Sequence, residues 1–165
     1  MKKTFITFAV FIIAITTSTA QEISNQTIGL RLGNYNGISY QKKITDDSRA
    51  ELTLAWRGYT AYSDVKADVA YHKVFNLDAI DSNMNWYLGI EGGAGFWKYE
   101  SNYYYSYYDY NDSGTYFFVG GVAGIEYKFE NIPLLLTLDT KPEIVFGNFY
   151  NGFHINGSIG IRYTL

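Results

Sequence analysis

The chain has 165 residues and a formal net charge of −3; 19% of its residues are aromatic, 16 are glycine, two are proline and none is cysteine. This composition excludes a disordered chain, a collagen-like repeat and a long coiled coil. A chain without cysteine can form neither a disulfide nor a thiolate metal site. The acidic balance argues against binding to nucleic acid.

The first 20 residues are typical of a removable export signal. Lys2 and Lys3 form a positively charged start, residues 5–15 are almost entirely apolar, and the stretch ends in Ser-Thr-Ala. We therefore predict cleavage near Ala20, which leaves residues 21–165 as one domain with 11 basic and 16 acidic side chains, a net charge of −5. A retained membrane anchor is the alternative, but the apolar stretch is shorter than the roughly 20 residues that a helix needs to cross a bilayer.

The remainder of the chain alternates between apolar and polar side chains with a period of two, which predicts β-strands. Asn, Asp, Gly and Ser separate these stretches. Several of them reach the roughly 9–11 residues that a tilted strand needs to cross a membrane, whereas strands of soluble proteins average about 5–6. We predict eight strands, at residues 27–33, 38–44, 49–57, 65–75, 85–97, 115–129, 134–144 and 154–165.

The two faces of these predicted strands differ in kind. One face is apolar throughout, as in the series Leu52, Leu54 and Trp56. The other face carries seven basic and six acidic side chains, with glycines between them. Its charged members are Arg31, Lys43, Glu51, Arg57, Lys66, Asp68, Glu91, Glu126, Lys128, Asp139, Lys141, Glu143 and Arg162.

The direction of the apolar face decides the class of protein. A soluble lipocalin-like barrel, which would carry a small apolar ligand, turns this face inward, whereas a transmembrane barrel turns it outward. Strand length favours the membrane, and so does glycine on the charged face, because a narrow barrel is crowded inside. Aromatic residues near strand ends, such as Trp56, Phe75 and Trp86, are typical of interfacial girdles. We therefore predict an all-β, eight-stranded, antiparallel, up-and-down transmembrane β-barrel.

The connections between the predicted strands differ in length. Bacterial barrels place short turns on the periplasmic side and longer loops outside the cell. We expect the connections after the odd-numbered strands at the cell surface, because this set contains the longest ones. They comprise residues 34–37, 58–64, 98–114 and 145–153, against 45–48, 76–84 and 130–133 for the even-numbered strands.

The chain ends in Ile159-Gly-Ile161-Arg-Tyr163-Thr-Leu165, an alternating apolar strand. With this end, residues 27–165 resemble the small eight-stranded barrels of Gram-negative outer membranes, the outer-membrane-protein β-barrel domain family. The resemblance implies insertion into outer-membrane lipid and recognition of the last strand by the barrel assembly machinery. Leu165 is a departure, since members most often end in Phe. The family includes anchors, adhesins, host-interaction proteins and a few lipid-modifying enzymes, so the resemblance implies no single activity.

Eight strands enclose a lumen just wide enough to be filled by side chains, so a wide pore is not expected. Buried carboxylates are costly unless paired, and a guanidinium can bond a carboxylate at two places. We predict that Arg31 and Arg162 pair with the carboxylates near mid-strand and plug the lumen; a gated ion or proton path is the alternative. The predicted cluster comprises Arg31, Glu51, Glu91, Asp139 and Arg162.

His72 and His154 are the two histidines of the chain, so an enzyme with a histidine base would have to use one of them. His154 and Ser158 share a face but lie about 13 Å apart at some 3.3 Å per residue, too far for a hydrogen bond. His72 follows Asp68 on the charged face, and we interpret it as a lumen residue held by a carboxylate. We therefore expect no catalysis, no cofactor and no metal site, with an enzyme acting on envelope lipid as a less favoured alternative.

A tyrosine-rich connection is the most unusual stretch of the sequence. Tyrosine is favoured at binding surfaces because it offers a rigid apolar ring with a polar tip. We therefore predict a structural or surface-interaction (adhesin-like) role with an unknown surface ligand; the alternative is a hairpin whose tyrosines form an aromatic girdle. The residues concerned are Tyr103, Tyr104, Tyr105, Tyr107, Tyr108 and Tyr110.

Overall fold

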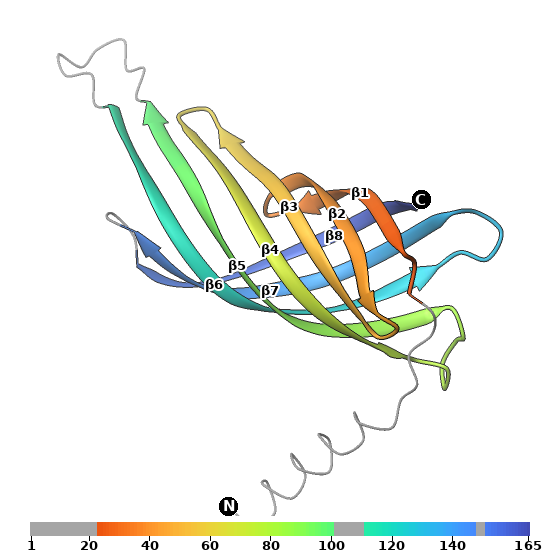
Figure 1. Ribbon diagram of the computed structural model, residues 1–165. Coiled ribbons are helices and arrows are strands. Elements are labelled where there is room, and N and C mark those ends of the chain that lie inside the picture. Colours follow the sequence, from red (N-terminus) through yellow and green to blue (C-terminus); the bar gives the residue numbers. More distant parts are fainter. Residues whose placement is uncertain (1–22, 101–110, 148–150) are drawn as a thin grey trace, which may run out of the picture.

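A computed structural model describes residues 23–100, 111–147 and 151–165. The predicted export signal and the six tyrosines from Tyr103 to Tyr110 lie outside the described residues. The described part forms a closed barrel in which each strand pairs antiparallel with its neighbours in the chain (Figure 1). Its strands are β1 (Gln26–Gly33), β2 (Asn36–Thr45), β3 (Ser48–Tyr59), β4 (Tyr62–Asn76), β5 (Met84–Glu100), β6 (Asn111–Lys128), β7 (Leu134–Gly147) and β8 (Gly152–Thr164).

The barrel closes where the first strand pairs with the last. β1 and β8 run antiparallel from the pair Thr27 and Thr164 to the pair Gly33 and Ser158. The backbone N–H of Leu165 donates a hydrogen bond to the carbonyl oxygen of Gln26 at 3.0 Å. Closure leaves no unpaired sheet edge along this seam, so the predicted up-and-down topology is confirmed.

All eight predicted strands are present, but several are longer than predicted. The prediction assigned residues 58–64 to a surface loop, whereas β3 and β4 continue to a turn at residues 60–61. They continue because Arg57 and Asp64 keep the alternation and face each other in the strand register. The β3–β4 connection is therefore shorter than predicted, whereas the β4–β5 connection runs over residues 77–83, close to its predicted bounds.

The apolar face points outward and the charged face points inward. Leu30, Ile90 and Ile159 have 58%, 70% and 57% of their surface exposed, whereas Glu51 and Arg162 have 1% and 0%. This orientation is opposite to that of a lipocalin-like barrel, so that alternative is wrong. None of the described residues forms a helix long and apolar enough to cross a membrane.

Glycines on the inner face make room for large side chains from neighbouring strands. A Cβ atom added at Gly124 would lie 2.5 Å from Cζ of Tyr87, and one added at Gly95 would lie 2.2 Å from Cζ of Tyr116. Both distances are far below van der Waals contact, so only glycine permits these rings to lie flat against the wall. The interleaving of glycine with charge in the sequence thus reflects a filled interior.

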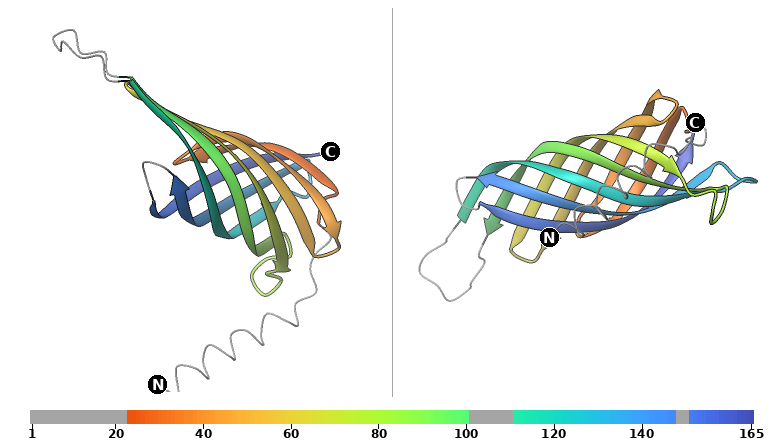
Figure 2. Two further views of the ribbon diagram at one scale, coloured as in Figure 1. Left: turned by 60° about the vertical axis from the view of Figure 1, so that its left-hand side comes forward. Right: turned by 90° about the horizontal axis from the view of Figure 1, so that it is seen from below.

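The wall of the barrel is uneven. β6 pairs with β5 from Asn111 onward but with β7 only from Tyr116, so the β5–β6 hairpin extends beyond β7, whereas β4 accompanies β5 as far as Tyr99 (Figures 1 and 2). The β6–β7 register is interrupted next to Pro142, which lies within β7. A proline has no N–H to donate to the sheet, and Pro142 still pairs in register with Ile155 of β8.

Candidate functional site

The centre of the lumen is organised around the carboxylate of Glu51 on β3, which accepts hydrogen bonds from the side chains of several other strands. Arg31 Nη1 on β1 donates a hydrogen bond to Oε1 of Glu51 at 2.6 Å, and Arg162 Nη2 on β8 donates to the same oxygen at 2.9 Å. Gln41 Nε2 on β2 donates to Oε2 at 2.6 Å. Four neighbouring strands of the wall are thereby joined across the interior by one carboxylate.

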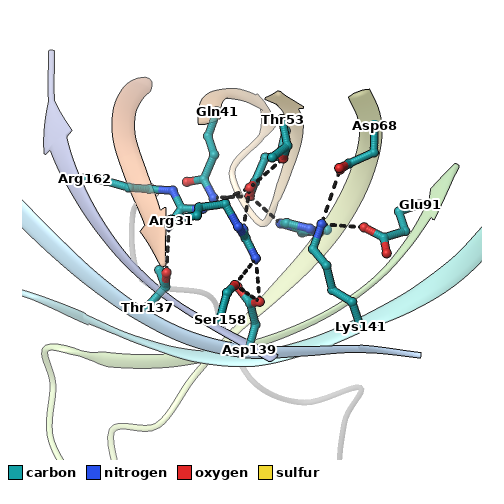
Figure 3. A network of polar contacts seen from close by, with 12 residues as sticks. Arg31, Gln41, Thr53, Asp68, Glu91, Thr137, Asp139, Lys141, Ser158 and Arg162 are labelled. Atoms are coloured by element: carbon teal, nitrogen blue, oxygen red, sulfur yellow. Dashed lines mark hydrogen bonds and ion pairs between the residues drawn. The ribbon is translucent and has the colours of Figure 1, made fainter. Parts of the chain in front are cut away.

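Arg31 also connects this carboxylate to a second one. Its Nη2 donates to Oδ1 of Asp139 on β7 at 2.5 Å. The same carboxylate accepts hydrogen bonds from the hydroxyls of Ser158 at 2.8 Å and Tyr87 at 2.9 Å. The structure therefore joins Arg31, Glu51, Asp139 and Arg162, four of the five predicted cluster residues, in one hydrogen-bonded network (Figure 3).

Glu91, the fifth predicted residue, belongs to a different group. Its partner is Lys141 on β7, whose Nζ lies 2.5 Å from Glu91 Oε2 and 3.2 Å from Asp68 Oδ1. The expectation that Arg31 or Arg162 would pair with Glu91 is therefore wrong. Sequence periodicity assigns each residue to the inner or the outer face of the barrel. It does not give the residue's height along the barrel axis or its position around the wall, and these decide which charges meet.

Two further buried ion pairs cross the lumen. Arg49 Nη1 lies 2.6 Å from Glu126 Oε2, and Lys66 Nζ lies 2.6 Å from Glu143 Oε1. Lys66, Glu126 and Glu143 were predicted on the charged face, but Arg49 was not, although it stands two positions before Glu51. Period-two spacing would have found it. The charged residues buried in the described part comprise Arg31, Arg49, Lys66, Lys141 and Arg162 and the acids Glu51, Asp64, Asp68, Glu91, Glu126, Asp139 and Glu143.

His72 is fully buried against the inner wall. Its ring stacks on that of Tyr87 with 5.0 Å between the centroids, and its Nδ1 accepts a hydrogen bond from Arg49 Nε at 3.4 Å. The nearby carboxylate is that of Glu51, with Oε2 at 3.8 Å from Nδ1. His72 is thus a packed lumen residue, as predicted, but the carboxylate beside it is Glu51 and not Asp68.

Nearer the mouth of the barrel, the carboxylate of Asp64 accepts hydrogen bonds from four side chains. Asp64 Oδ2 accepts hydrogen bonds from the hydroxyl of Tyr35 at 2.5 Å, the hydroxyl of Tyr62 at 3.1 Å and Arg57 Nη2 at 3.2 Å. Oδ1 accepts a fourth from the hydroxyl of Tyr116 at 2.7 Å. Burial, aided by the hydrogen bond to Asp64, raises the pKa of Tyr35 in the β1–β2 turn above its usual value, so this hydroxyl stays a donor.

A cavity of about 500 Å³ opens above Asp64 at the end of the barrel that carries the β1–β2, β3–β4, β5–β6 and β7–β8 connections. A second cavity of about 30 Å³, comparable to one water molecule, lies on the side of Lys66 and Arg31. The interior is therefore wide at this mouth and narrow at the charged network. The wide cavity is lined by Tyr35, Arg57, Tyr62, Asp64, Trp97, Tyr99, Asp112, Tyr116, Glu143, Val145, Gly147, His154 and Asn156.

A closed eight-stranded antiparallel barrel with an apolar exterior and a charged interior has the fold of an outer-membrane barrel. The chain is similar in structure to the crystal structure of the N-terminal β-barrel domain of Pseudomonas aeruginosa OprF, with a TM-score of 0.54 and 14% sequence identity over 85% of this chain and 98% of that domain. No protein-family model and no curated protein sequence matches the chain. The predicted resemblance to small outer-membrane barrels is thereby confirmed at the level of the fold.

Proposed function

We propose that this protein resides in the bacterial outer membrane, with lipid against its apolar wall. The exterior supports this proposal, because apolar residues on different strands, such as Leu30 on β1, Ile90 on β5 and Ile159 on β8, are more than half exposed. A water-soluble monomer rarely exposes a continuous apolar surface of more than a few hundred Å². Residence in this membrane requires export, which the predicted cleavage near Ala20 would complete.

The proposed role is structural and surface-interacting, with a plugged lumen in place of a wide pore. The crossing ion pairs support a plug, because the pairs of Arg31 and Lys141 with carboxylates on other strands span the interior at mid-height. Separating a buried ion pair leaves uncompensated charge and costs several kcal/mol. The lumen should therefore stay closed to solutes at rest.

The proposal includes no catalysis. Ser158, one candidate nucleophile, donates its hydroxyl hydrogen to Asp139 and accepts a hydrogen bond from Arg31. His72 is stacked against Tyr87 inside the wall. Both side chains are therefore used in packing the interior, which supports a structural role and disfavours an enzyme acting on envelope lipid.

Surface interaction rests on the β5–β6 hairpin, whose strand β6 extends beyond its neighbour β7 at the end that we assign to the cell exterior (Figure 2). In the sequence, the six tyrosines from Tyr103 to Tyr110 lie between β5 and β6. Their composition suits contact with a partner. At the opposite end, the exposed side chains of Ile159, Ile161 and Tyr163 on β8 suit recognition by the assembly machinery before the barrel closes.

Gel mobility and conductance test the membrane and plug proposals. The mature protein, folded in detergent micelles, should migrate differently before and after boiling, because a closed barrel resists detergent at room temperature. In planar bilayers it should show no steady conductance. A protein that stays soluble and monodisperse without detergent would contradict membrane residence. A stable open channel would contradict the plug.

A further inference from the structure

The proposed structural role and the plugged lumen do not account for the cavity at the mouth of the barrel. Its volume of about 500 Å³ lies within the range of small-molecule sites, which is about 300–1,000 Å³. Its lining combines five tyrosine and tryptophan side chains with six charged or polar ones, so aromatic surface and polar groups meet as they do in ligand sites. We propose that this cavity binds a small organic cation, an ammonium or guanidinium group carried on an apolar body. The inference deepens the surface-interaction role proposed above.

The floor of the cavity is held rigid by the hydrogen bonds to Asp64. Tyr35, Tyr62 and Tyr116 each donate a hydroxyl hydrogen to this carboxylate, and Arg57 adds a fourth bond. The rings come from the β1–β2 turn, β4 and β6, so the shape is set by elements on different sides of the mouth. A site that is ordered before binding loses less entropy on binding.

The protein's own cations show what the aromatic wall attracts. Cζ of Arg57 lies 4.5 Å from the ring centroid of Tyr35 and 5.5 Å from that of Tyr62. Nζ of Lys66 lies 4.7 Å from the Tyr35 centroid and 4.4 Å from that of Phe118. These distances are within the roughly 6 Å of cation–π attraction. The wall therefore already holds one guanidinium and one ammonium group.

Aromatic and acidic side chains also line the cavity towards its open side. Trp97 and Tyr99 lie two positions apart on β5, so their side chains follow each other along the inner face. Asp112 on β6, in register with Tyr99, lines the cavity beside them. Three carboxylates line the cavity, and two basic groups lie against them: Arg57, which pairs with Asp64, and Lys66, which pairs with Glu143 from outside the lining. The acidic side chains exceed the basic ones by one, so the local field favours a cation over an anion.

Trp97 provides the reporter for a direct test. The chain has three tryptophans, and the other two, Trp56 and Trp86, are on the outward-facing positions of β3 and β5. In the full mature protein carrying Trp56→Phe and Trp86→Phe, folded in micelles, choline should change the fluorescence of Trp97 saturably. Its neutral isostere 3,3-dimethylbutan-1-ol has the same shape without the charge and should bind at least fivefold more weakly.

Variants separate the aromatic and charge contributions. Tyr99→Leu and Asp112→Asn should each raise the Kd for choline about two- to fivefold, which is the effect of losing one exposed cation–π or charge contact. Tyr99→Phe keeps the ring and should retain affinity. Tyr59→Leu is the matched control, because Tyr59 is a 71% exposed tyrosine of the β3–β4 hairpin outside the lining, and its Kd should not change.

Three results would overturn the inference: no saturable response to choline, equal affinity for choline and the alcohol, or an equal loss in Tyr59→Leu and Tyr99→Leu. Each variant is first checked for the mobility shift on boiling, so that a misfolded protein is not scored. A barrel that keeps the shift but does not bind choline refutes the cation site alone. A protein without the shift refutes the membrane barrel itself.

Discussion

Glu51→Gln tests the charged network at the point where most of its bonds meet. The side chain of Glu51 is 1% exposed and accepts hydrogen bonds from Arg31, Arg162 and Gln41. The substitution keeps the size of the side chain and removes its charge, which leaves the Arg162 guanidinium without an acidic partner and Arg31 with Asp139 alone. Breaking a buried ion pair from one side costs about 3–5 kcal/mol, a large fraction of the roughly 5–15 kcal/mol that stabilises a typical protein.

The free energy of unfolding should be measured by urea titration of the barrel in phospholipid vesicles, with tryptophan fluorescence and gel mobility as the two probes. Asp46→Asn is the control, because the ion pair between Lys43 and Asp46 is at the surface, with the Asp46 side chain 97% exposed, and its loss should not be measurable. Adding Arg162→Met to Glu51→Gln should cost less than the sum of the two single changes, by about 0.5–3 kcal/mol. A loss below about 1 kcal/mol for Glu51→Gln, or strict additivity, would refute the proposed role of the network.

Further substitutions test the outer wall, the inner glycines and the mouth. Leu54→Arg, at a 46% exposed position on the outer face, should reduce stability in vesicles by about 2–4 kcal/mol if it lies near the bilayer midplane, and an unchanged urea midpoint would contradict lipid contact. Gly124→Ala should lose about 1–3 kcal/mol because its Cβ would overlap the Tyr87 ring, and Gly124→Ala combined with Tyr87→Ser should cost less on urea titration than the sum of the two separate losses. Tyr116→Phe removes one donor to Asp64 and should cost about 1–3 kcal/mol in the same assay; no change would mean that the floor of the mouth does not depend on that bond.

The sequence by itself determined the fold class and the contents of each face of the wall. Period-two alternation has a simple physical cause, since successive side chains of a strand point to opposite sides of the sheet. Leu54 and Glu51 could therefore be assigned to opposite faces without a structure. Strand ends were less well determined: Arg57 was predicted as the last residue of its strand and Asp64 as part of a loop, whereas the β3–β4 register continues past both.

Only the tertiary structure decided which inward-facing residues meet. Glu91 pairs with Lys141 two strands away, and the donors of Asp64 come from the β1–β2 turn, β3, β4 and β6. Such contacts depend on the stagger of the strands around a closed barrel, which brings together side chains far apart in the chain. The alternation along one strand carries no information about that stagger. The composition of the interior is thus a property of the sequence, whereas its ion pairs and the cavity at its mouth are properties of barrel closure.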